Sequence, residues 1–340
     1  MIDLQTLEKI DTKKMYKTYD KWPEIARRQY EIEFENINLD DFNHIIFAGM
    51  GGSGAIGDIF SAILSKTNIH VEVIKGYLLP KTVNKKTIVI VTSISGNTEE
   101  TLNVLEQAFI LKCKIIAFSN NGKMKNYCLK NKIKHVEILM EHSPRASFPA
   151  FLFSILKVLQ PFLPIKKNDV INSIIDLEKQ KEKISSLNLN RNNPALNLAE
   201  WINSIPMIYY PWGLQASAIR FKNSLQENAK MHAITEDVIE ACHNGIVSWS
   251  NRSIVKPILI QGSDDYIKTK ERWKILKAFF EEENIEYKEI YSNNGSIISK
   301  LINLIYLLDY STIFKSVIMK IDPSPVEPID FIKNKLNSNY

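Results

Sequence analysis

The stretch His44-Ile45-Ile46-Phe47-Ala48-Gly49-Met50-Gly51-Gly52-Ser53-Gly54 decides the fold class. Its first five residues are mostly β-branched or aromatic and predict a buried strand. The glycines that follow let the backbone turn sharply, and a helix is expected over residues 53–65. A strand, a glycine turn and a helix in this order are typical of a βαβ unit on a parallel sheet.

The same alternation continues on both sides of the middle of the chain. A charged, asparagine-rich stretch over residues 165–193 predicts a helix with frayed ends between two α/β halves. The predicted fold class is α/β, with two doubly wound subdomains whose parallel sheets are flanked by helices. We divide the chain into residues 1–160, a helical linker over 161–194, and residues 195–340. The further strands are expected at 70–74, 87–92, 114–119, 135–139, 206–210, 254–260 and 287–291, and the further helices at 97–111, 146–159, 215–227, 268–283 and 296–310.

Composition excludes several classes of protein. The 340 residues hold 43 Lys+Arg and 38 Asp+Glu, and this net charge of +5 is spread along the chain, which argues against a nucleic-acid surface. Hydrophobic residues make up 45% of the sequence, which argues against disorder. The cysteines are odd in number and form no CxxC motif, so we expect reduced thiols in the cytoplasm and no metal site. No secretory signal and no membrane span are expected, because the apolar runs are short.

The glycine loop over residues 49–54 is a candidate anion site. Backbone amides at the start of a helix favour negative charge. The loop also reads as G-x-G-x-x-G, and this pattern leaves a dinucleotide site open. That alternative requires an acidic residue at the end of the second strand. Glu72 has nearly the right spacing, but it lies inside the strand expected at 70–74, so the dinucleotide interpretation is the weaker one.

A second loop, Thr92-Ser93-Ile94-Ser95-Gly96-Asn97-Thr98-Glu99-Glu100, follows the third expected strand and carries several hydroxyl groups. Loops at the carboxyl ends of neighbouring parallel strands meet in one crevice. Ser53, Ser93, Ser95 and Thr98 are therefore expected to surround one phosphate together with the amide of Gly52. The alternative is that Ser95 or Asn97 only caps the following helix.

Both loops together resemble the sugar isomerase (SIS) domain, an α/β module that binds phosphosugars. Further stretches make the whole chain similar to the bifunctional phosphoglucose/phosphomannose isomerase family. They are Ser143-Pro144-Arg145-Ala146, the run from Arg220 to Lys230, His243-Asn244, and the tail Asp322-Pro323-Ser324-Pro325-Val326 with the Ile-Asp-x-x-Lys-like segment after it. The resemblance implies two SIS-like halves, a homodimer with shared active sites, and no cofactor. It also implies interconversion of fructose 6-phosphate with glucose 6-phosphate and mannose 6-phosphate through a cis-enediolate.

The resemblance assigns four catalytic residues. Glu227 is the base that carries the proton, and Arg145 stabilises the enediolate or an ordered water. His243 and Lys300 open the sugar ring, and in this family the histidine can be offered to the active site of the partner subunit. Arg145, His243 and Lys300 would also contact the substrate. Ordinary structural roles are the alternatives: a solvated glutamate, a surface histidine, a lysine that reaches solvent, and an arginine in a core salt bridge.

Two departures from the family pattern are visible. The glycine loop continues Ala55-Ile56-Gly57-Asp58 where Ile-Gly-Gly-Asp is usual, and Ser143-Pro144 stands in place of a proline pair. Neither departure removes a hydrogen-bond donor. Three alternative functions stay open at this stage: a SIS sensor that binds sugar phosphate without turnover, another SIS phosphosugar isomerase or deaminase, and the dinucleotide enzyme.

Overall fold

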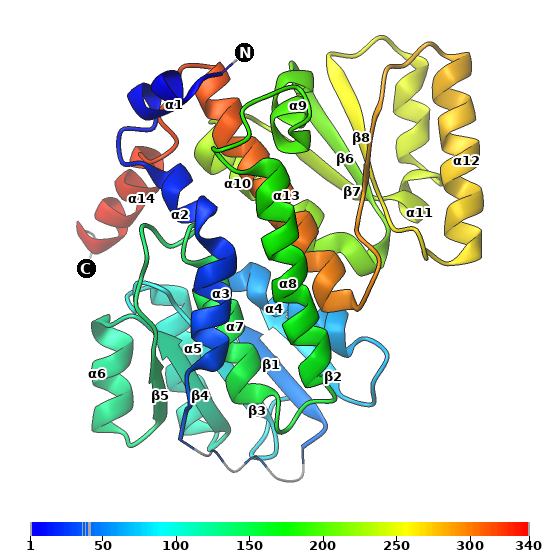
Figure 1. Ribbon diagram of the computed structural model, residues 1–340. Coiled ribbons are helices and arrows are strands. Elements are labelled where there is room, and N and C mark those ends of the chain that lie inside the picture. Colours follow the sequence, from blue (N-terminus) through cyan, green and yellow to red (C-terminus); the bar gives the residue numbers. More distant parts are fainter. Residues whose placement is uncertain (1, 36, 38, 40–41, 339–340) are drawn as a thin grey trace.

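The computed structural model describes residues 2–35, 37, 39 and 42–338, and it contains two parallel sheets with helices between and around them (Figure 1). The strands in this part of the chain are β1 His44–Ala48, β2 His70–Ile74, β3 Ile88–Thr92, β4 Lys114–Ser119, β5 Lys134–Glu137, β6 Ile205–Tyr210, β7 Ile234–Asp237, β8 Val255–Gln261 and β9 Lys288–Tyr291. The helices are α1 Leu4–Ile10, α2 Met15–Asp20, α3 Trp22–Glu31, α4 Gly51–Leu64, α5 Glu99–Ile110, α6 Gly122–Lys130, α7 Phe148–Leu159, α8 Lys167–Ile184, α9 Pro194–Trp201, α10 Gln215–Asn228, α11 Val238–Ala241, α12 Ile267–Glu282, α13 Ile297–Ile318 and α14 Glu327–Ser338, with short 3₁₀ turns η1 Trp212–Leu214 and η2 Gly245–Ser250.

The first sheet has the strand order β2-β1-β3-β4-β5, and every pair in it is parallel. Its central strand β3 is buried along its whole length, because helices cover both faces of the sheet. The chain order reverses between β1 and β3. In an open parallel sheet this reversal leaves a crevice at the carboxyl ends of the two strands, and ligands bind there.

The second sheet has the order β7-β6-β8-β9 and is also parallel throughout. Its helix α10 follows β6 and runs back toward the amino ends of the strands. As a result, α10 begins at the carboxyl edge of the second sheet and ends at the opposite edge. This direction decides which residues of the second half can reach the first.

The two halves are joined by a helical layer. Helix α13 packs against α8, α9 and α10, while α4 of the first half contacts α7, α10 and α13. Figure 1 shows α8 and α13 between the two sheets. One continuous hydrophobic core therefore runs from the first sheet through these helices into the second half.

By length and composition alone, helix α13 could span a membrane. However, 83% of its most apolar 18-residue stretch is buried inside the structure. Such burial is expected of a core helix. The helix is also longer than the predicted range of 296–310. It continues to Ile318 because Ile313, Phe314 and Val317 are buried in the same core.

The predicted α/β fold with two helix-flanked parallel sheets is confirmed. Every strand expected from the sequence is present, with ends that shift by one or two residues. Several elements were not predicted from the sequence. They are the short strand β7, the helices α6, α9, α11 and α14, and the amino-terminal helices α1 to α3. Helix α3 packs against α7 and α8, and α1 and α2 pack against α13, so the amino-terminal segment belongs to the core.

Candidate active site

The glycine loop after β1 presents uncapped amides at the start of α4. Gly51 has a φ of +52°, which favours glycine, and it turns the chain directly into the helix. The helical hydrogen bonds begin with the N–H groups of Ser53 and Gly54, which both donate to the Met50 carbonyl. The amides of Gly51 and Gly52 have no acceptor within the helix, and no side chain caps this end. The site is therefore built to attract an anion.

The loop after β3 holds its hydroxyl groups in a fixed arrangement. The Ser93 and Thr98 hydroxyls lie 2.9 Å apart, and Ser93 Oγ also accepts the Gly96 N–H at 3.1 Å. Gly96 has a φ of +70°, and a Cβ there would lie 1.6 Å from the Asn121 carbonyl oxygen. Only glycine fits this turn, which keeps Ser93 buried and leaves Ser95 exposed.

The helix-capping alternative is tested by the same contacts. Thr98 occupies the cap position of α5, but its side chain makes no capping hydrogen bond there. Asn97 Oδ1 accepts the N–H of Lys123 at the start of α6 instead. Among the residues that the structure describes, Ser95 Oγ accepts only the nearby N–H of Asn97, at 3.3 Å. Capping of α5 thus does not account for these side chains.

The two loops touch each other and border Arg145. A Cβ on Gly49 would lie 3.0 Å from the Thr92 carbonyl oxygen, so the first loop passes directly over the end of β3. A Cβ on Gly52 would lie 3.6 Å from Arg220 Nη1 and 3.9 Å from the Cα of Arg145. The glycine loop therefore borders the buried Arg220 guanidinium group and the backbone of Arg145.

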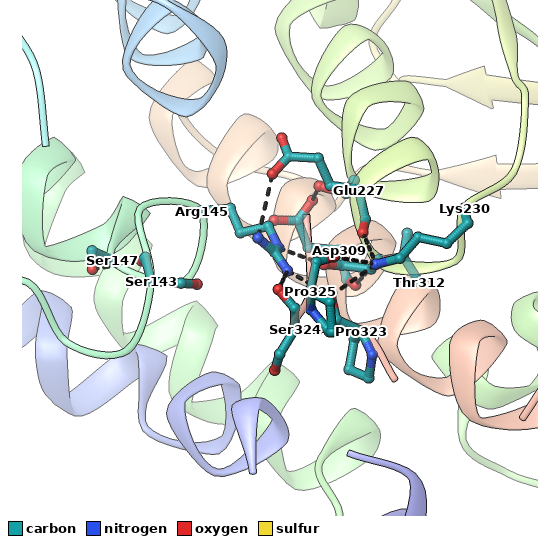
Figure 2. Close-up of polar contacts among 12 residues, drawn as sticks. Ser143, Arg145, Ser147, Glu227, Lys230, Asp309, Thr312, Pro323, Ser324 and Pro325 are labelled. Carbon is teal, nitrogen blue, oxygen red and sulfur yellow. Dashed lines mark hydrogen bonds and ion pairs between the residues drawn. The ribbon is translucent and has the colours of Figure 1, made fainter. Parts of the chain in front are cut away.

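Arg145 is 5% exposed and joins three distant segments (Figure 2). Its Nε donates to Asn228 Oδ1 at 2.6 Å, and its Nη2 donates to the carbonyls of Pro323 and Ser324 at 2.5 and 3.0 Å. Its Nη1 lies 3.4 Å from Glu227 Oε2. Arg145 therefore has one guanidinium nitrogen facing the Glu227 carboxylate, while the others are held by the end of α10 and the tail.

A second buried arginine supports the first. Arg220 donates from Nε and Nη2 to Asp309 Oδ2 at 2.9 and 2.6 Å, and its Nη2 also donates to the Arg145 carbonyl at 2.9 Å. Its guanidinium carbon lies 3.8 Å from the centre of the Phe148 ring. Burial raises the pKa of the Asp309 carboxyl, while the Arg220 charge and the Ser224 hydroxyl favour its ionised form.

Glu227 stands in the last turn of α10 with 27% of its side chain exposed, so its carboxylate is open to a ligand on one side. Lys230 follows it and fixes the end of the helix to the tail. Its Nζ donates to the carbonyls of Glu227 and Pro325 at 2.6 and 2.8 Å. Burial, and then the Arg145 charge, lower the pKa of Lys230.

Comparison with known proteins relates this chain to a family. A profile of the bacterial phospho-glucose isomerase C-terminal SIS domain matches residues 191–336, and a SIS domain profile matches residues 38–154. The structure of a hypothetical protein from Thermus thermophilus aligns with a TM-score of 0.74 at 14% identity, covering 98% of this chain and 94% of that one, which shows the shared fold. The bifunctional phosphoglucose/phosphomannose isomerase of Aquifex aeolicus is 28% identical, covering 91% of this chain and 96% of its own length. The protein of the same name from Caldicellulosiruptor bescii is 30% identical over 340 residues, 95% of this chain and 98% of that protein.

The chain belongs to the bifunctional phosphoglucose/phosphomannose isomerase family. The family resemblance predicted from the sequence is thus confirmed, and the protein is an isomerase. Its two SIS matches fall on the two halves that the structure shows as separate sheets.

Within one chain, the isomerase does not bring all of its predicted site residues together. Gly52 and Ser53 lie near the loop that carries Ser93, Ser95 and Thr98, and Arg145 faces Glu227. His243 and Lys300 lie elsewhere, at the carboxyl edge of the second sheet. His243 follows β7 and the short helix α11 and is not buried.

Lys300 stands in the first turn of α13 and forms an ion pair with Asp264. The carbonyl of its neighbour Leu301 accepts a hydrogen bond from Ser217 near the start of α10. Glu227 is ten residues further along α10, which corresponds to roughly 15 Å along the helix axis. Neither His243 nor Lys300 therefore contacts the Glu227 and Arg145 pair of its own chain.

Three residues of this candidate site were not predicted as site residues: Arg220, Asn228 and Asp309. Arg220 and Asn228 belong to the stretch that carries the family resemblance, so a signal was present. Asp309 lies 89 residues from its partner Arg220, inside an apolar helix. Its sequence signal is a charge at a position that helical periodicity assigns to the core.

Proposed function

We propose that the protein is a cofactor-free aldose–ketose isomerase that interconverts fructose 6-phosphate with glucose 6-phosphate and mannose 6-phosphate. The observation that carries this proposal is the pairing of the Glu227 carboxylate with Arg145, beside the anion loop at Gly52. A base, a fixed positive charge and an anion cradle are the parts that this reaction requires.

The phosphate would occupy the crevice at the switch point between β1 and β3. The amides of Gly51 and Gly52 and the Ser53 hydroxyl would bind it from one side, and Ser93, Ser95 and Thr98 from the other. These donors are neutral, so binding would rely on hydrogen bonds and the two helix amino ends. This placement would direct the sugar toward Arg145 and Glu227.

Glu227 would move the proton between the reacting carbons. In the aldose-to-ketose direction its carboxylate takes the proton from C2, the C–H electrons form the C1=C2 bond of the cis-enediolate, and the C1=O π electrons move to O1. The protonated Glu227 then returns the proton to C1, while the hydroxyl proton of O2 passes to O1 and the C2 carbonyl forms. Arg145 carries a delocalised positive charge beside Glu227, so it would stabilise the enediolate oxygen throughout without competing for the proton.

Ring opening requires a group that exchanges a proton with the ring oxygen and the anomeric hydroxyl. His243 suits this task because an imidazole ring can donate a proton from one nitrogen and accept one at the other. Its distance from Glu227 within one chain favours a homodimer in which His243 of one subunit serves the site of the other. A cytoplasmic location suits such a metabolic enzyme with free thiols.

Two lysines are candidates for the ring-opening step. The sequence resemblance implies Lys300, but its ion pair with Asp264 holds it at the other edge of the second sheet. Lys333 is the alternative. It stands in the tail segment with family resemblance, exposed on α14, ten residues after the Pro323 carbonyl that Arg145 binds. Lys300→Met and Lys333→Met, measured side by side, should distinguish them, because the catalytic lysine is the one whose loss lowers kcat.

The reaction itself is tested with purified protein, fructose 6-phosphate and EDTA, followed by separation of the hexose phosphates. Formation of glucose 6-phosphate and mannose 6-phosphate would support the proposal. Tight binding of fructose 6-phosphate without any aldose product would indicate a sensor. Release of ammonia from an aminosugar phosphate in a parallel reaction, again without aldose product, would indicate a deaminase. Either of these last two results refutes the proposed function.

Shared active sites are tested by mixing two inactive variants. Glu227→Gln and His243→Ala subunits, combined and allowed to exchange, form heterodimers in which one site is intact if His243 acts on the partner. About half of the dimers would be mixed, and one of the two sites in each mixed dimer would be intact. Roughly a quarter of the wild-type activity should therefore return. If His243 acts within its own subunit, no activity returns.

A further inference from the structure

A group of metal-ligating side chains lies at the opposite end of the first sheet from the anion loops. His44 begins β1, His70 begins the neighbouring edge strand β2, and these two residues are direct partners in the parallel register. Glu72 is two residues after His70 and therefore points to the same face of the sheet. One ligand atom from each of the three side chains lies within 4.8 Å of the other two.

We propose that His44, His70 and Glu72 bind a divalent transition metal, with zinc as the best fit. Two imidazole nitrogens and one carboxylate oxygen form a common protein ligand set for zinc, with a fourth position left to water. The exposed side of His70 leaves room for that water. This group was not predicted from the sequence, because its members are 26 and 2 residues apart, which is not the spacing of a local metal motif.

The hydrogen bonds around the group leave the ligand atoms free. His44 Nε2 is buried and has no hydrogen-bond partner among the described residues. The other ring nitrogen of His44, Nδ1, lies 3.3 Å from Thr87 Oγ1. If Nδ1 carries the proton and donates to Thr87, then Nε2 presents its lone pair to a metal, and metal-binding histidines are commonly oriented in this way.

Glu72 supplies the negative charge that such a site requires. Within the described part of the chain its carboxylate makes no ion pair or hydrogen bond. The two histidine rings are tilted by 46° to each other, with centres 4.9 Å apart. A metal would satisfy the orphaned nitrogen and the unpaired carboxylate with one ion.

The consequence for the protein is structural rather than catalytic. The metal would join the edge strand β2 to β1 at their amino ends, roughly 16 Å along β1 from Gly49 at about 3.3 Å per residue. Substrate at the carboxyl edge would not reach it. Metal binding should therefore raise the melting temperature of the protein. Removal of the metal with EDTA should leave the isomerase activity unchanged.

The experiment is calorimetric titration of EDTA-treated, dialysed protein with Zn²⁺. The wild type should bind one ion per chain, and His70→Ala and Glu72→Gln should each weaken binding at least roughly tenfold. Neither side chain is buried, so circular dichroism should show that both variants are folded. The matched control is His232→Ala, which removes a histidine far from the site in sequence.

The control should bind like the wild type, and Zn²⁺ should raise the melting temperature of the wild type and of His232→Ala but of neither site variant. Wild-type affinity in both His70→Ala and Glu72→Gln would overturn the proposal. The absence of a one-to-one binding event in the wild type would do the same. An equal loss in His232→Ala would also overturn it, because it would mean that surface histidines bind the ion.

Discussion

Replacing Asp309 by asparagine should destabilise the protein and disturb the active site together. Asp309 is fully buried and accepts two hydrogen bonds from Arg220 and one from Ser224, at 2.6 to 2.9 Å. Asparagine keeps the shape but removes the charge, which leaves Arg220 buried without its counter-ion. Breaking a buried pair in this way costs about 3–5 kcal/mol. Arg220 retains the Phe148 ring and the Arg145 carbonyl, so we expect the lower part of that range, about 3 kcal/mol.

The assay is urea unfolding at equilibrium, followed by circular dichroism, with the slope checked so that the midpoint reports stability. Ser224→Ala is the matched control, because it removes one hydrogen bond and keeps the ion pair; about 1.5 kcal/mol is expected for it. The double replacement Arg220→Met with Asp309→Leu should cost less than Asp309→Asn alone. A loss below about 1 kcal/mol in Asp309→Asn would show that Arg220 and Asp309 do not form a charged pair in the core.

Three further predictions concern the loops and the amino-terminal segment. Ser95→Ala should raise the dissociation constant for fructose 6-phosphate roughly tenfold without a change in stability. Ser93→Ala should raise this constant as well and also lower the free energy of unfolding by about 1 kcal/mol. Calorimetric titration measures the dissociation constant, and urea titration measures the stability. Gly96→Ala should lower the free energy of unfolding by roughly 3 kcal/mol, because its Cβ would overlap the Asn121 carbonyl, and a urea midpoint near wild type would contradict this contact. Burial raises the pKa of the Asp11 carboxyl, so its contribution to stability is full below the unfolded value of about 3.9 and is lost as pH rises through the folded value. The stability of Asp11→Asn relative to wild type should therefore increase from about pH 4 upward, and a constant or falling difference in melting temperature would refute that sign.

Much of the fold could be predicted because the strands are continuous apolar runs with strong turn signals. Ile88–Thr92 is buried on both faces, so its sequence needs no alternation to be recognised. Strand β7, Ile234–Asp237, was missed because it is a short edge strand in which polar residues outnumber apolar ones. Helix α14 mixes charged and apolar residues and follows a proline-rich stretch, and no helix was predicted there.

The candidate site was predictable where it depends on consecutive residues and not where it depends on packing. The loops after β1 and β3 could be related because topology alone brings the ends of adjacent parallel strands together. The Arg220 and Asp309 pair depends on the crossing of α10 and α13, which no local pattern encodes. The separation of Lys300 from Glu227 depends on the direction of α10. This helix begins near Lys300, at the carboxyl ends of the strands of the second sheet, and ends with Glu227 near their amino ends.

In the proposed reaction, Glu227 carries a proton between two carbons of a bound sugar phosphate. The most direct measurement is deuterium incorporation into fructose 6-phosphate and its aldose products in D₂O, followed by NMR, for wild type and Glu227→Gln. We predict deuterium at C1 and C2 with the wild type, and a rate lower by roughly 10²–10⁴ in Glu227→Gln with the affinity for fructose 6-phosphate retained. Exchange at an undiminished rate in Glu227→Gln would contradict the account.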